Sequence, residues 1–147
     1  MKENSLVPNS VTYGCLIDAC VKNNQVERAM EVFDAMKKDG VPLNTIIFTT
    51  LIKGFARQYN LEKALEIYEF MKLDDKIRPN NVTFNSLIDC CIRCNNINAA
   101  WEIFEEMKAS ITKPDLITYS TMIKGFCKDK NIEKALVMLD QMEKAGI

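Results

Sequence analysis

The sequence predicts an all-α fold, a right-handed α-solenoid of tandem helix–turn–helix repeats. One string, aromatic-x-x-(Leu/Met)-Ile, recurs at separations of 35, 36 and 35 residues, and an alanine and a methionine keep the same register. A period of about 20 to 50 residues indicates stacked units, none of which buries its apolar face alone. The markers are Tyr13, Phe48, Phe84 and Tyr119; Ala29, Ala64, Ala100 and Ala135; and Met36, Met71, Met107 and Met142.

Each repeat divides into two helical stretches. The first helices are expected at 11–22, 46–57, 82–93 and 117–128, and the second helices at 26–38, 61–73, 97–109 and 132–145. In the second helices, apolar residues follow the i, i+3, i+4, i+7 spacing of a buried face, as Ala29, Val32, Phe33 and Met36 do. Small alanines let the paired helix approach closely, and the larger side chains fill the space between repeats.

The repeats are expected to span residues 10–44, 45–80, 81–115 and 116–147, after a tail of a preceding repeat in residues 1–10. The fourth repeat stops before its own tail, so we expect the chain to be a piece of a longer array. Exposed repeat ends favour end-to-end self-association of such a piece. Within the repeats, Asn60, Asn96 and Asn131 are predicted to cap the second helices. Between repeats, Pro8-Asn9, Pro42-Leu43-Asn44, Pro79-Asn80 and Pro114-Asp115 end one helix before the next begins.

Composition excludes several classes of site. No apolar run reaches the ~18 residues that cross a bilayer, so no membrane partner is expected. The chain has no histidine and no Gly-rich phosphate loop, and its carboxylates are scattered, so we expect no enzyme activity from these residues. Cys91-x-x-Cys94 beside Cys90 is the one cluster with metal-like spacing, and it lacks a second ligand pair. We expect no metal or cofactor, and cysteines that pack as free thiols in a reducing compartment.

Charge is distributed unevenly although the net charge is only −1. A cation stands nine residues after each aromatic marker: Lys22, Arg57, Arg93 and Lys128. Acidic residues gather in the second helices, among them Glu27, Glu62, Glu66, Glu102 and Glu133. If the first helices line the concave face, a row of positive charges follows the inner groove, spaced to meet the phosphates of a single strand. The alternative is solvated charge near helix ends.

Two further sets keep the register. The residues after the aromatics and the last residues of the complete repeats are small and mostly polar: Gly14, Thr49, Asn85 and Ser120; and Asn44, Asn80 and Asp115. Such side chains complement base edges, and they are also preferred helix caps. Aliphatic residues stand two positions before each aromatic, where they could press on base faces: Val11, Ile46, Val82 and Ile117.

These strings resemble the pentatricopeptide repeat family over residues 8–147. Val82 to Asp89 is similar to the family's first helix, and Glu133 to Met142 to its second. Tetratricopeptide repeats share the architecture, but their Trp-x-x-Leu-Gly-x-x-Tyr signature is missing here. The resemblance implies a solenoid that binds single-stranded RNA, one base per repeat, with the RNA 5′ to 3′ alongside the protein N to C.

The resemblance also assigns roles to the registered positions. Base recognition would fall to Gly14 with Asn44, Thr49 with Asn80, Asn85 with Asp115, and Ser120. It implies that the Thr49 pair selects adenine, that the Asn85 pair selects uracil, that Ser120 selects a purine, and that the Gly14 pair has a weak preference for adenine. Val11, Ile46, Val82 and Ile117 would sandwich bases, and Lys22, Arg57, Arg93 and Lys128 would contact phosphates. These assignments require the base-recognition residues to be accessible from the concave side.

The resemblance further implies a mitochondrial or plastid protein that processes or stabilises RNA. No targeting segment is visible in these residues. The alternative function is a protein-interaction scaffold that grips a peptide in the same groove.

Overall fold

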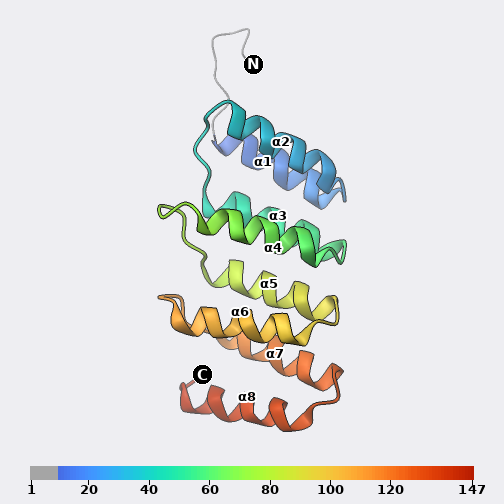
Figure 1. Ribbon diagram of the computed structural model, residues 1–147, viewed down its shortest axis with the longest axis vertical. Helices are drawn as coiled ribbons and strands as arrows, with labels where there is room; N and C mark the ends of the chain where they lie inside the picture. The colour runs from blue at the N-terminus through green and yellow to red at the C-terminus, as the bar shows by residue number, and fades with distance from the viewer. Residues whose placement is uncertain (1–9) are drawn as a thin grey trace.

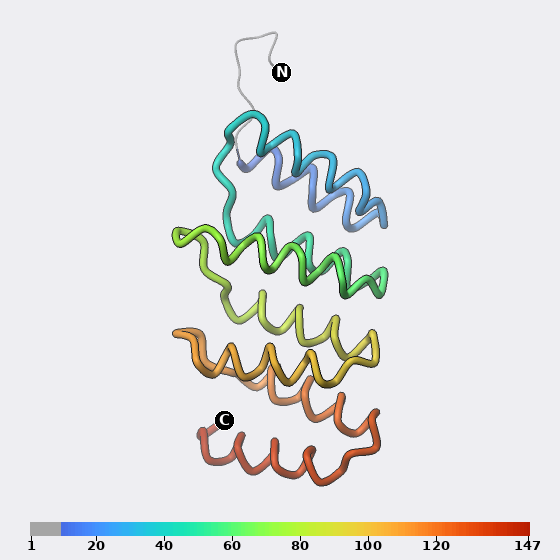
Figure 2. Tube along the Cα trace, viewed as in Figure 1, coloured from blue at the N-terminus to red at the C-terminus, as the bar shows by residue number. Residues whose placement is uncertain are grey.

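The computed structural model describes residues 10–147, which form eight α-helices in four antiparallel pairs. The pairs are stacked along the long axis of the molecule (Figure 1), and the chain passes from one pair to the next without crossing itself (Figure 2). The helices are α1 (Ser10–Lys22), α2 (Val26–Lys38), α3 (Thr45–Arg57), α4 (Leu61–Lys72), α5 (Asn81–Arg93), α6 (Ile97–Ala109), α7 (Leu116–Lys128) and α8 (Ile132–Lys144).

The predicted all-α solenoid is therefore confirmed, and every predicted helix is present within one residue at each end. Each first helix begins one residue earlier than predicted, because the first residue after the capping residue already has helical geometry. The expected tail of a preceding repeat and the turn at Pro8-Asn9 fall in residues 1–9, outside the described part of the chain. Among the described helices, none has the length and apolar character needed to span a bilayer.

The two helices of each repeat belong to different layers. The first helices approach each other closely at the backbone, α1 with α3, α3 with α5 and α5 with α7. Successive second helices touch through long side chains, as in the edge-to-face contact between Phe33 of α2 and Phe70 of α4 and the hydrogen bond from Tyr68 of α4 to Glu106 of α6. The closely spaced layer of a curved stack lies on its inner side, so α1, α3, α5 and α7 form the concave layer.

The core runs continuously between the layers and follows the repeat register. All four marker aromatics and all four marker alanines are buried, as are Met36, Met71 and Met107, while Met142 is partly covered. Aromatic rings join neighbouring repeats: Phe33 meets Phe48, Tyr68 meets Phe84, and Phe104 meets Tyr119, with centroids 5.6 to 6.1 Å apart. Each repeat therefore completes its core with a side chain from the next one.

The turn inside each repeat has one conformation in all four copies. A residue with positive φ, at Asn24, Tyr59, Asn95 and Lys130, precedes the N-cap of the second helix. The predicted caps are confirmed, since the side chains of Asn60, Asn96 and Asn131 accept the backbone N–H three residues on. The first repeat has Gln25 at this position, and its side chain makes no capping bond although its φ of −110° and ψ of 56° resemble the −105° and 78° of Asn60.

We expect Gln25→Asn to stabilise the protein. The shorter amide fits the capping geometry of the other repeats and supplies the missing acceptor, so the free energy of unfolding should rise by about 0.5 to 1 kcal/mol. Thermal unfolding of the variant and of wild type measures the change. Asn96→Gln is the matched control and should lose a similar amount. Equal stability of all three proteins would contradict the capping argument.

Candidate functional site

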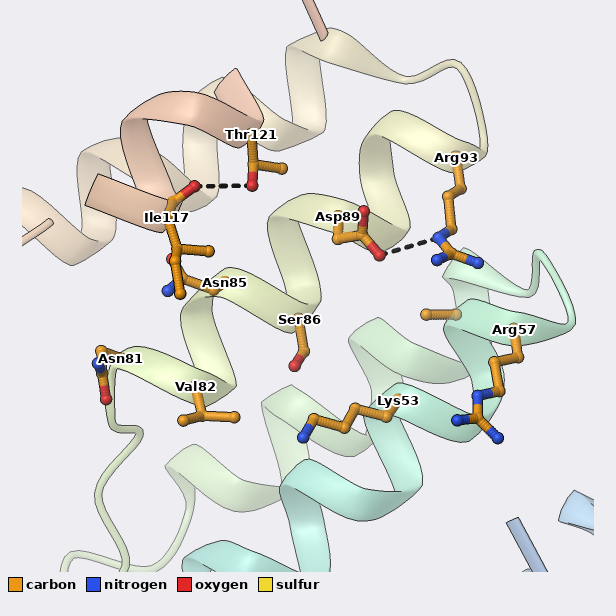
Figure 3. A pocket seen from close by; sticks show the side chains of 11 residues that line it. Lys53, Arg57, Asn81, Val82, Asn85, Ser86, Asp89, Arg93, Ile117 and Thr121 are labelled. Carbon is orange, nitrogen blue, oxygen red and sulfur yellow. Dashed lines mark hydrogen bonds and ion pairs between the residues drawn. The ribbon is translucent and has the colours of Figure 1, made fainter. Parts of the chain in front are cut away.

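A cavity of about 400 Å³ opens between α3, α5 and α7 on the concave layer. Two aliphatic side chains, Val82 and Ile117, flank the amide of Asn85, and Lys53 and Arg57 extend along the neighbouring helix (Figure 3). The remaining lining residues are Ala56, Asn81, Ser86, Asp89, Arg93 and Thr121. The cavity thus combines apolar walls, one central amide and a positively charged edge.

A second cavity, of about 450 Å³, lies between α1 and α3 and has aliphatic walls from the same repeat positions, but no lysine or arginine of residues 10–147 lines it. Val11 and Ile46 flank it, and Gly14 and Asn44 lie between them. These four residues stand at the same repeat positions as Val82, Ile117, Asn85 and Asp115 further along the chain, shifted by two repeats. The repeated register shows that the cavity is a property of the repeat and not an accident of one helix contact.

The aliphatic side chains that flank both cavities are exposed. Val11, Ile46 and Ile117 keep 70%, 72% and 62% of their surface accessible, and Val82 keeps 41%. Single exposed aliphatic residues are ordinary on protein surfaces, but here four stand at one position of every repeat on the same layer. Such a row is typical of a surface that contacts flat apolar ligand groups.

Capping accounts for one of the two polar sets and not for the other. Asn44, Asn80 and Asp115 are N-caps of α3, α5 and α7, and each accepts the backbone N–H three residues on at 3.0 Å. The residues after the aromatics lie inside the helices, beyond the first turn, and cap nothing. The capping interpretation is therefore right for the last residues of the repeats and wrong for Gly14, Thr49, Asn85 and Ser120.

The expectation that Thr49 and Asn85 are freely accessible is wrong for the folded chain. They keep only 6% and 9% of their surface exposed, because each is hydrogen-bonded to the following repeat. Thr49 Oγ1 lies 2.8 Å from Thr83 Oγ1, and Thr118 Oγ1 donates to Asn85 Oδ1 at 2.5 Å. Asn85 still lines the cavity with its remaining edge, whereas Asn80 is exposed and Asp115 and Ser120 are half-buried.

Asp115 is both a cap and the partner of Asn85. Its Oδ1 accepts from Asn85 Nδ2 at 3.2 Å, and its Oδ2 accepts from Asn81 Nδ2 at 3.0 Å. Partial burial alone would raise the pKa of this carboxyl, but the hydrogen bonds from Asn81, Thr118 and Asn85 outweigh it and lower the pKa to about 2. Asp115 is therefore ionised at neutral pH and acts as an acceptor only.

The four expected cations are exposed, but the row is not uniform. Lys22 is paired with Asp18 at 3.0 Å, and Arg93 is paired with Asp89 at 2.8 Å. Arg57 and Lys128 have no carboxylate within 4 Å among residues 10–147. The sequence analysis did not consider the position five residues after each aromatic, which holds Asp18, Lys53, Asp89 and Lys124.

This position makes the charge of the concave layer alternate. In repeats 1 and 3 it carries an aspartate that neutralises the cation one turn later. In repeats 2 and 4 it carries a lysine, so Lys53 adds to Arg57 and Lys124 adds to Lys128. The i, i+4 spacing was visible in the sequence and is the signal by which these lysines could have been found.

The cysteine cluster belongs to the core. Cys90 and Cys91 are fully buried, and burial raises the pKa of each thiol to about 12. Within the described residues, no three His, Cys, Asp or Glu side chains are grouped to hold a metal ion.

The network around Asp115 makes stability depend on pH in a defined window. The pKa of Asp115 falls from 3.8 to about 2 on folding, so its contribution is present above pH 3.8 and is lost as the pH falls through about 2. We expect Asp115→Asn, which keeps a capping oxygen, to flatten the loss of stability between these pH values. Thermal melts from pH 5 to about pH 2 measure it. A pH profile identical to wild type would contradict the assigned hydrogen bonds.

The chain is similar in sequence and in structure to known helical-repeat proteins. The family model described as the pentacotripeptide-repeat region of PRORP matches residues 2–147. Pentatricopeptide repeat-containing protein At3g16010 of Arabidopsis thaliana is 44% identical over 41 residues, which are 28% of this chain and 6% of that protein. The chain therefore spans a small fraction of that relative's length.

Solved structures extend the likeness to the whole chain. The pentatricopeptide repeat protein PPR10 from maize matches with a TM-score of 0.89 and 23% identity, covering 99% of this chain and 21% of that one. PPR10 in complex with an 18-nt psaJ RNA element matches with a TM-score of 0.81 and 28% identity, covering 99% of this chain and 22% of that one. The match of the family model over nearly the full length, with these neighbours, identifies the chain as a member of the pentatricopeptide repeat family.

Proposed function

We propose that this chain binds single-stranded RNA selectively, one base per repeat, as part of a larger RNA-processing or RNA-stabilising protein. The observation that carries the proposal is the cavity flanked by Val82 and Ile117, with Asn85 between them and free cations at its edge. Aliphatic walls suit base faces, an amide suits a base edge, and lysine and arginine suit phosphates. The RNA-bound maize protein, 28% identical over 99% of this chain, supports the same class of ligand.

Base recognition is assigned to Thr49 with Asn80 and to Asn85 with Asp115, which we propose select adenine and uracil at adjacent positions. Gly14 with Asn44 leaves a site in which the position after the aromatic supplies neither a hydroxyl nor an amide. Ser120 contributes a hydroxyl in the fourth repeat. The sandwiching residues are Val11, Ile46, Val82 and Ile117, and the phosphate contacts are Lys22, Arg57, Arg93 and Lys128, to which we add Lys53 and Lys124.

The whole protein is proposed to act in mitochondria or plastids, and any catalytic step is proposed to lie outside these residues. Organelle import of the full-length protein fused to a fluorescent reporter tests the location. A reporter that stays outside both organelles would remove this part of the proposal without touching RNA binding.

Base selectivity is tested with short single-stranded RNAs that carry adenine and uracil opposite repeats 2 and 3. Exchanging the two bases should weaken binding by about fivefold or more, since a hydrogen bond is worth about 1 kcal/mol. The double variant Asn85→Thr with Asp115→Asn copies the repeat 2 pair into repeat 3 and should change the preferred third base from uracil to adenine. Fluorescence anisotropy at low salt measures the affinities. Indifference of the wild type to the exchange, or tight binding of a peptide with no RNA affinity, would overturn the proposal in favour of a scaffold.

The alternating charge predicts where phosphates are held. Lys53→Ala should weaken binding to all sequences alike and reduce the slope of log affinity against log salt by about 0.7. Asp89→Asn releases Arg93 and should strengthen binding and steepen the slope by a similar amount.

Matched controls make the same charge changes on the outer layer, where Lys63 pairs with Glu66 and Lys108 pairs with Glu105. Lys63→Ala and Glu105→Gln should leave the slope nearly unchanged. If the inner and outer variants behave identically, net charge and not the groove governs binding.

A further inference from the structure

The junction between consecutive repeats places one side chain behind each base-recognition residue. The third residue of α3, α5 and α7 is Ile47, Thr83 and Thr118, and all three are buried. Thr83 and Thr118 form capping boxes with Asn80 and Asp115 within their own helices. Their hydroxyls also reach back into the preceding repeat, to Thr49 and to Asn85. Capping alone does not need this second contact.

Thr118 and Asp115 together fix the amide orientation of Asn85. The Thr118 hydroxyl lies near two acceptors, Asn85 Oδ1 at 2.5 Å and Asp115 Oδ1 at 2.9 Å, and the shorter contact assigns its single proton to Asn85 Oδ1, which carries no hydrogen of its own. Asn85 Nδ2 then donates to Asp115 Oδ1 at 3.2 Å. The reversed amide would set Oδ1 against a carboxylate, two acceptors facing each other. The second Nδ2 hydrogen has no partner among the described residues, so Asn85 offers a donor to the cavity that it lines.

The contact with Thr83 has the opposite effect on Thr49. The single hydroxyl proton of Thr83 lies toward Asn80 Oδ1, an acceptor without hydrogens 3.1 Å away. Thr83 Oγ1 is therefore left to accept the proton of Thr49 across 2.8 Å. Thr49 then spends its only proton inside the protein, so the small part of it that stays exposed, 6% of its surface, can only accept, whereas Asn85 in the next repeat can donate.

We propose that Thr83 and Thr118 are positioning residues for base recognition, each of which sets whether the base-facing residue of the preceding repeat donates or accepts a hydrogen bond. This inference rests on the proposed RNA binding. A donor at Asn85 suits the O4 acceptor of uracil and opposes the N4 amino group of cytosine. An acceptor at Thr49 suits the amino group of adenine. The selectivity of one repeat thus depends on a residue of the next.

The first repeat lacks this device. Ile47 replaces the threonine and has no hydroxyl, and it lies beside Gly14, where a Cβ would meet only Ile47 Cγ1 at 4.0 Å. With no polar side chain at the position after the aromatic and no hydroxyl behind it, repeat 1 should discriminate bases least. The open space at Gly14 also lets a larger side chain be introduced there without a clash.

Thr118→Val tests the proposal, because valine keeps the shape and removes the hydroxyl. The full 147-residue chain is titrated with single-stranded RNAs that carry uracil or cytosine opposite repeat 3, and adenine or uracil opposite repeat 2. We expect the uracil-to-cytosine affinity ratio at repeat 3 to fall about fivefold while the ratio at repeat 2 is unchanged. Thr83→Val should do the reverse, and Thr118→Ser should restore the wild-type ratio.

Other results would overturn it. If the wild type discriminates uracil from cytosine and Thr118→Val discriminates equally well, the positioning role is wrong while base recognition stands. A uniform loss of affinity for every RNA would show a structural role only. If the wild type does not discriminate at all, the proposed function itself fails.

A transplant into repeat 1 keeps the inference testable should Thr118→Val unfold. Gly14→Asn with Asn44→Asp supplies the repeat 3 pair at repeat 1, and the same pair combined with Ile47→Thr also supplies the threonine. We expect a preference for uracil over cytosine opposite repeat 1 only when Ile47→Thr is present. Equal preference in both proteins, with circular dichroism showing both folded, would refute the role of this position.

Discussion

Stacking of each first helix on the first helix of the next repeat is the contact on which the rest of the molecule depends. Helix α3 buries Phe48, Leu51 and Ile52 completely or nearly so, because α1 and α5 lie against it and the rings of Phe33 and Phe70 from the second helices pack on Phe48. The same stacking brings residues 35 positions apart to one side of the molecule. Val82 and Ile117 flank a cavity because α5 and α7 are neighbours in the concave layer, and the outer helices contribute only the support that holds this layer together.

Because the cavities lie at the helix junctions, the polar groups that stabilise the junctions are also the ones that line or border the cavities. Asp115 caps α7, accepts from Asn81 and Asn85, and stands beside the cavity. A buried amide or hydroxyl left unpaired would cost about 1 to 3 kcal/mol, so the junction satisfies these groups within the protein. The consequence is a site whose donors and acceptors are ordered by folding, which lowers the cost of ordering side chains when a ligand binds. Thr49 and Asn85 have low exposure for the same reason, since each is hydrogen-bonded to a threonine of the following repeat.

The charges of the concave layer follow a different pattern from the hydrogen bonds at the repeat junctions, because they lie in the later turns of the first helices. The cations in the last turns of the first helices stand near the negative helix ends, which explains their presence in every repeat without a ligand. Aspartates one turn earlier neutralise two of them, and lysines at the same position double the charge of the other two repeats. Unpaired positive charge is therefore concentrated in repeats 2 and 4, while the best ordered polar site is in repeat 3. In the proposed function, affinity and selectivity would therefore depend on different residues of the same helices.

The repeat period, the eight helices, the buried alanines and methionines, and the asparagine caps all follow from local spacing, which is why the chain alone was enough to predict them. The exposed aliphatic row could be located for the same reason. The burial of Thr49 and Asn85 could not be predicted, because it depends on the hydroxyl groups of Thr83 and Thr118, 34 and 33 residues further along the chain. Periodicity says which residues share a face, but the direction of a hydrogen bond between repeats is settled only when the helices pack and each buried polar group finds its partner.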